Sequence, residues 1–229
     1  MNLLLLSNSR MPDAGYLAHA MGAVVEIASG CQQVVFFPFA GVTIGWDDYT
    51  QNVRTAFAPL GLSVVGAHTL ESGDTGFSKS DLIFVGGGNT FRLLLECRQR
   101  GWLNKIRSAI TGGSPYMGSS AGSVLACPTI RTTNDMPIVD PKGLDALGLV
   151  PFQLNCHFTD HMPPGHQGET RRQRISEFLT LSPSERVIGL PEGDWIRVRD
   201  TEYRLGGPFT AWEFRHGCDP FSHQEGVAL

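Results

Sequence analysis

The sequence has no long apolar run and no long run of basic residues, and each absence argues against a class of protein. None of its 229 residues belong to a stretch that approaches the roughly 18 apolar residues of a membrane span. The formal net charge is −4, which argues against nucleic acid or a membrane surface as the main partner. The apolar start Met1–Leu6 has no basic residue and stops at polar Ser7, so we expect a first strand there and no secretion signal.

Cysteine is sparse and scattered along the chain. The five cysteines contain no C-x-x-C pair: Cys31, Cys97, Cys127, Cys156 and Cys218. A disulfide framework and a structural zinc site are therefore both disfavoured. Small buried thiols in a reducing compartment explain these residues, and we expect a cytoplasmic protein.

Strands and helices are predicted to alternate along most of the chain. Seven short apolar runs predict strands, at residues 3–6, 33–38, 62–65, 81–85, 114–117, 152–158 and 186–191. Five segments predict helices, at residues 14–28, 47–60, 91–96, 102–110 and 168–181, with an aspartate capping the second. This alternation is typical of a three-layer α/β sandwich with a mostly parallel sheet and helices on both faces.

The remaining segments complete this picture. Residues 71–80 predict a surface loop, and the alternating tail 195–214 predicts an antiparallel ribbon at one edge. With 41% hydrophobic residues the chain can fill a substantial core, and no linker or repeat divides it. We therefore expect a single domain over residues 1–229.

The segment Gly118-Ser119-Ser120-Ala121-Gly122 lies where a predicted strand turns into a helix. It has the G-x-S-x-G pattern of a nucleophile elbow, in which small neighbours let a sharp turn expose one hydroxyl. The N–H groups that begin the following helix can face negative charge developing on a substrate carbonyl. Glycine and serine also fill ordinary loops, so it is the strand–turn–helix context that favours Ser120 as a nucleophile.

The segment Gly86-Gly87-Gly88-Asn89 also lies where a strand becomes a helix. It lacks the G-x-G-x-x-G spacing and the lysine of a P-loop, so we expect no nucleotide and no cofactor. Glycines let backbone N–H groups approach a substrate oxygen, which makes Gly88 a candidate oxyanion donor beside the amide of Ala121. A tight turn with positive φ explains the same glycines equally well.

A serine nucleophile needs a base, and His157 is the histidine that ends a predicted strand downstream of the elbow. The alternative is a metal cluster of His157, Asp160, His161 and His166. The sequence has no H-E-x-x-H pattern, and Pro163-Pro164-Gly165 would break any shared helix. We therefore expect no metal site.

Two carboxylates compete to orient the imidazole of His157. Glu192 ends the predicted strand 186–191, and Asp135 lies in the polar segment after the elbow. The orienting carboxylate has to be held rigidly against the ring, and a strand end does this better than a loop. The pattern therefore favours Glu192, with Asp135 as the alternative third member or as a residue that lines the substrate site.

Arg171 belongs to a group of arginines in the first turn of a predicted helix, where cations oppose the helix dipole. A solvated basic face is the ordinary explanation. An arginine that binds a substrate carboxylate through two hydrogen bonds would also explain it.

Six motifs together resemble the aspartyl dipeptidases, also called peptidase E. They lie at residues 86–90, 118–123, 130–137, 157–158, 168–171 and 190–193. The resemblance covers nearly the whole chain. It implies a metal-independent serine peptidase that cleaves dipeptides with an N-terminal aspartate. It also implies an α/β sandwich related to the class I glutamine amidotransferases, whose nucleophile is cysteine where this chain has Ser120.

Position by position, the resemblance makes Ser120 the nucleophile and His157 the base, and Arg171 the residue that binds the aspartyl side chain. It leaves the third member open between Glu192 and Asp135. The expected partner is a small acidic dipeptide, and no obligate protein partner is evident. A related serine amidase or esterase that acts on another small acyl substrate is the alternative.

Overall fold

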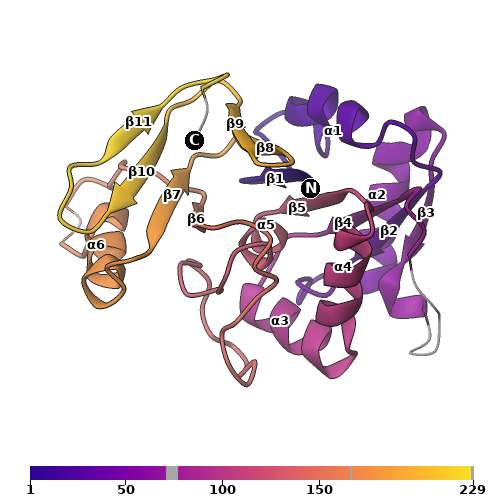
Figure 1. Ribbon diagram of the computed structural model, residues 1–229, viewed down its shortest axis with the longest axis horizontal. Coiled ribbons are helices and arrows are strands. Elements are labelled where there is room, and N and C mark those ends of the chain that lie inside the picture. The colour runs from indigo at the N-terminus through magenta and orange to yellow at the C-terminus, as the bar shows by residue number, and fades with distance from the viewer. Residues whose placement is uncertain (71–76, 166, 228–229) are drawn as a thin grey trace.

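The computed structural model describes residues 1–70, 77–165 and 167–227, and it consists of two β-sheets with helices packed around them (Figure 1). The strands are β1 (Asn2–Leu6), β2 (Gln33–Phe37), β3 (Ser63–Gly66), β4 (Asp81–Val85), β5 (Tyr116–Ser119), β6 (Gln153–Cys156), β7 (Arg186–Leu190), β8 (Trp195–Arg199), β9 (Glu202–Gly206), β10 (Ala211–Arg215) and β11 (Phe221–His223). The helices are α1 (Met21–Ile27), α2 (Trp46–Phe57), α3 (Thr90–Gln99), α4 (Trp102–Thr111), α5 (Ala121–Leu125) and α6 (Arg171–Leu181).

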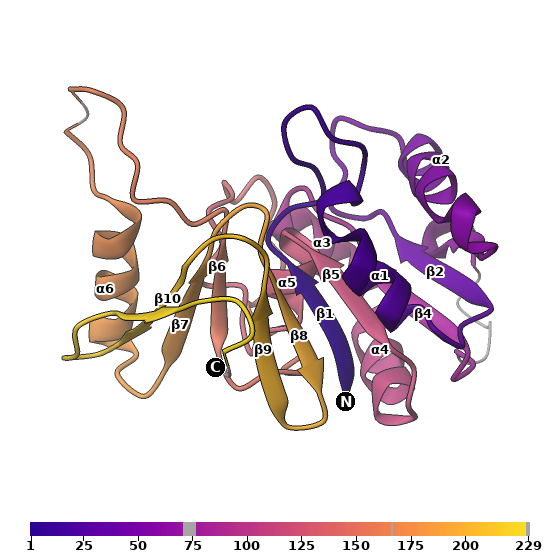
Figure 2. The same ribbon diagram turned by 90° about the horizontal axis from the view of Figure 1, so that it is seen from above.

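The larger sheet has seven strands in the order β3-β2-β4-β5-β1-β8-β9. The strands from β3 to β1 run parallel, and β8 and β9 follow antiparallel at one edge. Leu3 and Leu5 belong to the core cluster that includes α3, α4 and α5, whereas Leu4 and Leu6 belong to the cluster that includes α1 and α2. Helices thus cover both faces (Figure 2), which is why the parallel strands are apolar throughout.

Strands β6 and β7 do not join the larger sheet. They pair in parallel and continue antiparallel through β10 to β11, in a second sheet of order β11-β10-β7-β6. The prediction of one sheet is wrong in this respect, because β8 hydrogen-bonds to the free edge of β1 and occupies the place where β6 would pair. The predicted ribbon is divided accordingly: β8 and β9 form it, and β10 lies in the other sheet.

Three predicted helix starts differ from the structure, and that of α6 lies at Arg171, after the N-cap Thr170, instead of at residue 168. Regular helix does not begin at residue 14, because Leu17 has a φ of 61°, and α1 follows only after a 3-10 turn at Ala18–Ala20. Helix α2 has Gly45 as its N-cap with no side-chain cap, so the predicted aspartate cap is wrong. Asp47 and Asp48 instead lie in the first turn, where negative charge favours the helix dipole. Of the predicted loop 71–80, residues 71–76 lie outside the described residues.

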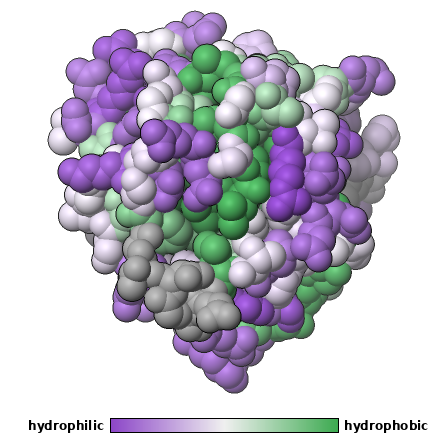
Figure 3. Space-filling view, turned by 90° about the vertical axis from the view of Figure 1, so that its right-hand side faces the viewer, coloured by the Kyte–Doolittle hydropathy of each residue, from purple (hydrophilic) through white to green (hydrophobic). Residues whose placement is uncertain are grey.

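The length of the helices and the apolar residues on the surface both bear on what the protein can contact. None of their helices is long and apolar enough to cross a membrane. On the side seen in Figure 3, a band of apolar residues runs between hydrophilic ones. Strand β3, at the end of the larger sheet, lies on this side of the molecule.

The core position of Leu5 gives a test of the packing. Leu5 is fully buried on β1, so Leu5→Ala should lower the free energy of unfolding by about 2–5 kcal/mol through lost apolar contact and a cavity. Val25 is 47% exposed on α1, and Val25→Ala should change the free energy of unfolding by less than about 0.5 kcal/mol. Urea denaturation of both variants measures the difference. Equal losses would contradict the placement of β1 in the core.

Candidate active site

The carboxyl ends of five strands from both sheets meet at one cavity. Ser120 follows β5, Gly88 follows β4, and Asn8 follows β1, while His157 and Glu192 follow β6 and β7 of the second sheet. The cavity has a volume of about 400 Å³. Its lining consists of Asn8, Ser9, Arg10, Tyr49, Gly87, Gly88, Ser120, Asp135, His157 and Glu192. Sites at the carboxyl ends of parallel strands are expected for an α/β architecture.

Ser120, His157 and Glu192 form a continuous hydrogen-bonded chain. Ser120 Oγ lies 2.7 Å from His157 Nε2, and His157 Nδ1 lies 2.7 Å from Glu192 Oε1. The side chains of His157 and Glu192 are 37% and 54% exposed, so substrate and water can reach the imidazole. A hydroxyl, an imidazole and a carboxylate in this order are the arrangement that activates a serine by general base catalysis.

The backbone at Ser120 has the sharp turn that the G-x-S-x-G pattern predicts. Ser120 has a φ of 49° and a ψ of −110° and donates its N–H to Leu6 O at 3.0 Å. Gly122 has no room for a side chain, because an added Cβ would clash with the Val85 carbonyl. The turn therefore depends on close contact of α5 with the end of β4, and it raises the hydroxyl above the sheet.

Two backbone N–H groups are available near the Ser120 hydroxyl. In the described part of the chain, neither Gly88 N–H nor Ala121 N–H donates a hydrogen bond to protein. Gly88 has a φ of 132° and faces the Ala40 carbonyl where a Cβ would stand, so a side chain would be excluded there. Ala121 directly follows Ser120, and Gly88 lines the same cavity, so both N–H groups stay candidates for an oxyanion hole.

Tyr49 and Asn8 support this cavity and were not singled out from the sequence. The Tyr49 hydroxyl accepts from Gly87 N–H at 3.0 Å and donates to Gly87 O at 3.2 Å, so α2 fixes the glycine loop. Asn8 Oδ1 accepts from Gly193 N–H at 2.8 Å, which fixes the turn that carries Glu192. No local pattern marks either residue, because each acts on a segment far away in the sequence.

Asp194 adjoins the same turn and is fully buried. Its Oδ1 accepts from Phe209 N–H at 3.0 Å, and burial raises the pKa of its carboxyl to about 6. The backbone carbonyl of Asp194 accepts from Ser7 N–H at 3.0 Å. Asp194 thereby joins the Glu192 turn to both β1 and the segment before β10.

Asp135 lines the cavity but contacts other groups than His157. Its Oδ2 accepts from Thr90 N–H at 2.8 Å, from Thr90 Oγ1 at 2.5 Å and from Thr133 Oγ1 at 3.1 Å. Thr90 is the first residue of α3, so the carboxylate lies at a helix N-terminus, where negative charge is stabilised. Of the two competing carboxylates, the structure brings Glu192 to the imidazole and places Asp135 at this helix end.

Arg171 is the first residue of α6, and it is not among the residues that line the cavity. It is half-buried and has no ionic partner among the described residues. Burial, followed by the nearby charge of Arg174, lowers the pKa of its guanidinium. The neighbouring Arg172 is engaged elsewhere, because it holds Asp160 with two bonds of 2.7 and 2.6 Å and stacks on Trp212.

The histidine–aspartate cluster considered from the sequence is not assembled as a metal site. Asp160 pairs with Arg172, His157 is bonded to Ser120 and Glu192, and His166 lies outside the described residues. Among residues 1–70, 77–165 and 167–227, no group of three or more His, Cys, Asp or Glu could hold a metal ion.

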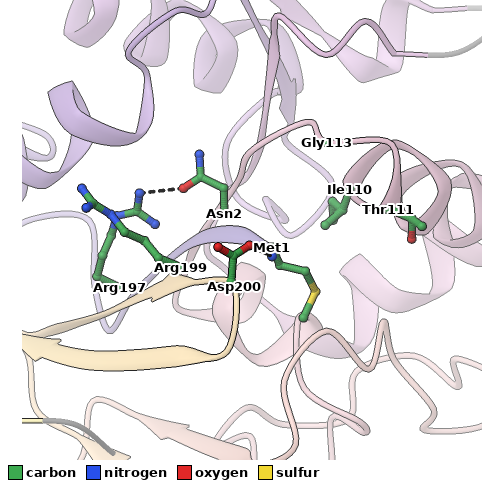
Figure 4. Close-up of a pocket in the computed structure, with 8 residues that line it drawn as sticks. All are labelled: Met1, Asn2, Ile110, Thr111, Gly113, Arg197, Arg199 and Asp200. Carbon is green, nitrogen blue, oxygen red and sulfur yellow. Dashed lines mark hydrogen bonds and ion pairs between the residues drawn. The ribbon is translucent and has the colours of Figure 1, made fainter.

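A larger cavity of about 810 Å³ lies at the opposite end of β1. Figure 4 shows that its charged groups are paired: Arg197 bonds to Asn2, and the terminal amine of Met1 bonds to Asp200. Arg197 and Arg199 also share Glu26. Because these charges already have partners and no histidine lines this cavity to activate the hydroxyl of Thr111, it lacks the arrangement found at Ser120.

Sequence comparison identifies relatives over the whole chain. The profile of peptidase family S51 matches residues 3–206. Peptidase E of Salmonella arizonae is 52% identical over 229 residues, which cover 100% of this chain and 97% of that protein. Peptidase E of Citrobacter koseri is 54% identical over 217 residues, which cover 95% of each chain.

Two solved structures have a similar fold. A putative peptidase E protein from Listeria monocytogenes has a TM-score of 0.59 and 25% identity, covering 90% of this chain and 98% of its own. A peptidase from an acI-B1 actinobacterium has a TM-score of 0.67 and 16% identity, and the match covers 100% of this chain and 96% of that chain. With the family profile and the relatives above 50% identity, these findings place the chain plainly: it belongs to peptidase family S51.

Proposed function

We propose that this peptidase hydrolyses dipeptides with an N-terminal aspartate through an acyl-enzyme on Ser120. The observation that carries the mechanism is the chain of two 2.7 Å contacts from Ser120 through His157 to Glu192. Ser120 Oγ attacks the peptide carbonyl while His157 Nε2 takes its proton, and Glu192 stabilises the imidazolium. His157 then protonates the leaving amine, and water hydrolyses the ester.

The proposed oxyanion hole consists of the N–H groups of Gly88 and Ala121. The negative oxygen of the tetrahedral intermediate would accept from both donors. Each donor of this kind is worth about 3 kcal/mol of transition-state stabilisation. The support for this role is that neither N–H donates to a protein group in the described part of the chain.

The proposed substrate has two carboxylates, one on the aspartyl side chain and one at the C-terminus. We assign Arg171 to the side chain, because its half-buried guanidinium has no ionic partner in the described part of the chain and therefore gains most from an anion. We assign Arg10 to the C-terminal carboxylate. Arg10 lines the cavity, and its backbone carbonyl accepts from Asn8, which also holds the Gly193 turn. Asn8 thereby links Arg10 to the turn that carries Glu192, the partner of His157.

The whole chain is proposed to act as a single domain with a class I glutamine amidotransferase-like arrangement. Support comes from the largest core cluster, which contains Leu3 and Val85 of the larger sheet together with Leu154 and Ile188 of the second sheet. A core shared by both sheets supports one folding unit and argues against two separate domains.

The assignment of the nucleophile is tested by Ser120→Ala. The variant should keep its folding free energy and lose Asp-Leu hydrolysis by at least about 10³-fold, because no attacking group remains. Rates for Asp-Leu, Leu-Leu, glutamine and a small ester should be measured in parallel with the unmodified enzyme. A folded Ser120→Ala variant with full activity would refute the mechanism, and a preference for glutamine or the ester would replace the substrate assignment.

The orienting carboxylate is tested by Glu192→Gln and Asp135→Asn. Glu192→Gln should lower kcat by about 10³–10⁴-fold, because the imidazolium loses its counter-charge and the tautomer is no longer fixed. Asp135→Asn should affect kcat less, because the carboxylate contacts Thr90 and Thr133. Steady-state kinetics with Asp-Leu compare the two, and a larger kcat loss for Asp135→Asn would reverse the assignment.

The two carboxylate contacts are tested by Arg171→Met and Arg10→Met. Loss of a charged hydrogen bond should cost about 10- to 100-fold in kcat/KM. Arg171→Met should lower kcat/KM by this amount for Asp-Leu but leave kcat/KM for Asn-Leu unchanged. Arg10→Met should lower kcat/KM for Asp-Leu but leave kcat/KM for Asp-Leu amide unchanged. Arg174→Met, an exposed site in the same helical turn, is the control. Equal losses for acid and neutral substrates would contradict the assignments.

A further inference from the structure

The last residue of β1 and the residue after it are hydrogen-bonded to the proposed nucleophile and the proposed base. Leu6 O accepts from Ser120 N–H at 3.0 Å, and the next residue, Ser7, accepts from His157 N–H through its Oγ at 2.9 Å. Two consecutive residues at the end of β1 thus hold the backbones of Ser120 and His157. The segment Leu6–Ser7 therefore fixes the backbones of Ser120 and His157 relative to one another.

The Ser7 hydroxyl is fully buried and uses both of its hydrogen-bonding functions. It accepts from His157 N–H, and it donates to Leu190 O at 2.8 Å. His157 lies directly after β6, and Leu190 is the last residue of β7, two residues before Glu192. One hydroxyl therefore joins the larger sheet to both strands of the second sheet that supply the site.

His157 needs this support because its backbone is strained. Its φ of 55° lies in the left-handed region, which residues with a side chain seldom adopt. Such conformations persist only where surrounding contacts fix them. Phe158 N–H donates to Leu190 O at 3.0 Å, but the N–H of His157 itself has Ser7 Oγ as its partner.

We propose that Ser7 is a positioning residue that holds His157 in its strained conformation, so that the imidazole spans Ser120 and Glu192. This inference rests on the proposed function. Ser7 does not contact the reacting atoms, and it acts through the backbone of His157. Without the hydroxyl, His157 N–H would lose its partner, Leu190 O would keep only Phe158 N–H, and the backbone of His157 would be free to relax away from Ser120.

The experiment compares Ser7→Ala with Ser114→Ala. Ser114 is also a buried serine, 2% exposed, whose hydroxyl donates to Ser78 O at 3.0 Å, but it precedes β5, away from Ser120. Ser7→Ala should lower kcat for Asp-Leu by about 10- to 100-fold, as a small misplacement of a catalytic group does, and leave KM nearly unchanged. Ser114→Ala should lower the urea midpoint and leave kcat unchanged.

A double-variant cycle shows whether Ser7 acts through His157. If it does, Ser7→Ala and Glu192→Gln impair the same imidazole, and the kcat loss of the double variant should be smaller than the product of the single losses. In the control cycle, the kcat loss of the Ser114→Ala/Glu192→Gln double variant should equal the product of the two single losses. The proposal would be overturned if the kcat loss of the Ser7→Ala/Glu192→Gln double variant equalled the product of the two single losses. Equal kcat losses for Ser7→Ala and Ser114→Ala would also overturn it.

Ser7→Thr and Ser7→Val provide a second test that does not depend on the folding of Ser7→Ala. These variants have the same shape and differ only in the hydroxyl, so Ser7→Thr should exceed Ser7→Val in kcat by about 10-fold or more. Equal kcat values would overturn the positioning role. Failure of the proposed function looks different: the unmodified enzyme would not cleave Asp-Leu, or Ser120→Ala would remain active.

Discussion

The meeting of two separate sheets at the end of β1 is the constraint on which the site depends. The larger sheet supplies Ser120 and the glycine loop, and the second sheet supplies His157 and Glu192. Neither sheet alone contains the hydrogen-bonded chain of these three side chains. The hydrogen bonds of Ser7 with Leu190 and His157, and of Asn8 with Gly193, therefore set the geometry of the reacting groups, since they fix one sheet against the other.

The two residues that exchange a proton in the proposed mechanism both have strained backbones. Ser120 and His157 both have positive φ values, 49° and 55°. Each strained residue follows the end of a strand and is held by a hydrogen bond to the β1 terminus. This placement lets rigid β-structure aim two side chains at one another, and the cost of the strain is offset by the packing of the surrounding core.

Sequence patterns predicted most elements of the larger sheet, because its parallel strands are buried on both faces and their apolar runs end at glycine or polar residues. The predicted start of the first helix was wrong, because the pattern of apolar residues does not indicate that Leu17 adopts a left-handed backbone conformation. The division into two sheets was missed for a similar reason. An apolar run such as 186–190 predicts a buried strand but says nothing about which edge that strand pairs with.

The sequence by itself determined the chemistry that the chain can offer: a serine in a glycine-flanked turn, a histidine and a glutamate at strand ends, an aspartate in a polar segment, and membership of a peptidase family. The local pattern favoured Glu192 over Asp135, but only the tertiary structure brings Glu192 to the imidazole and Asp135 to the start of α3. It also brought Ser7, Asn8 and Tyr49 to the site. Hydrogen bonds between residues more than a hundred positions apart, such as that of Ser7 with His157, have no local signature.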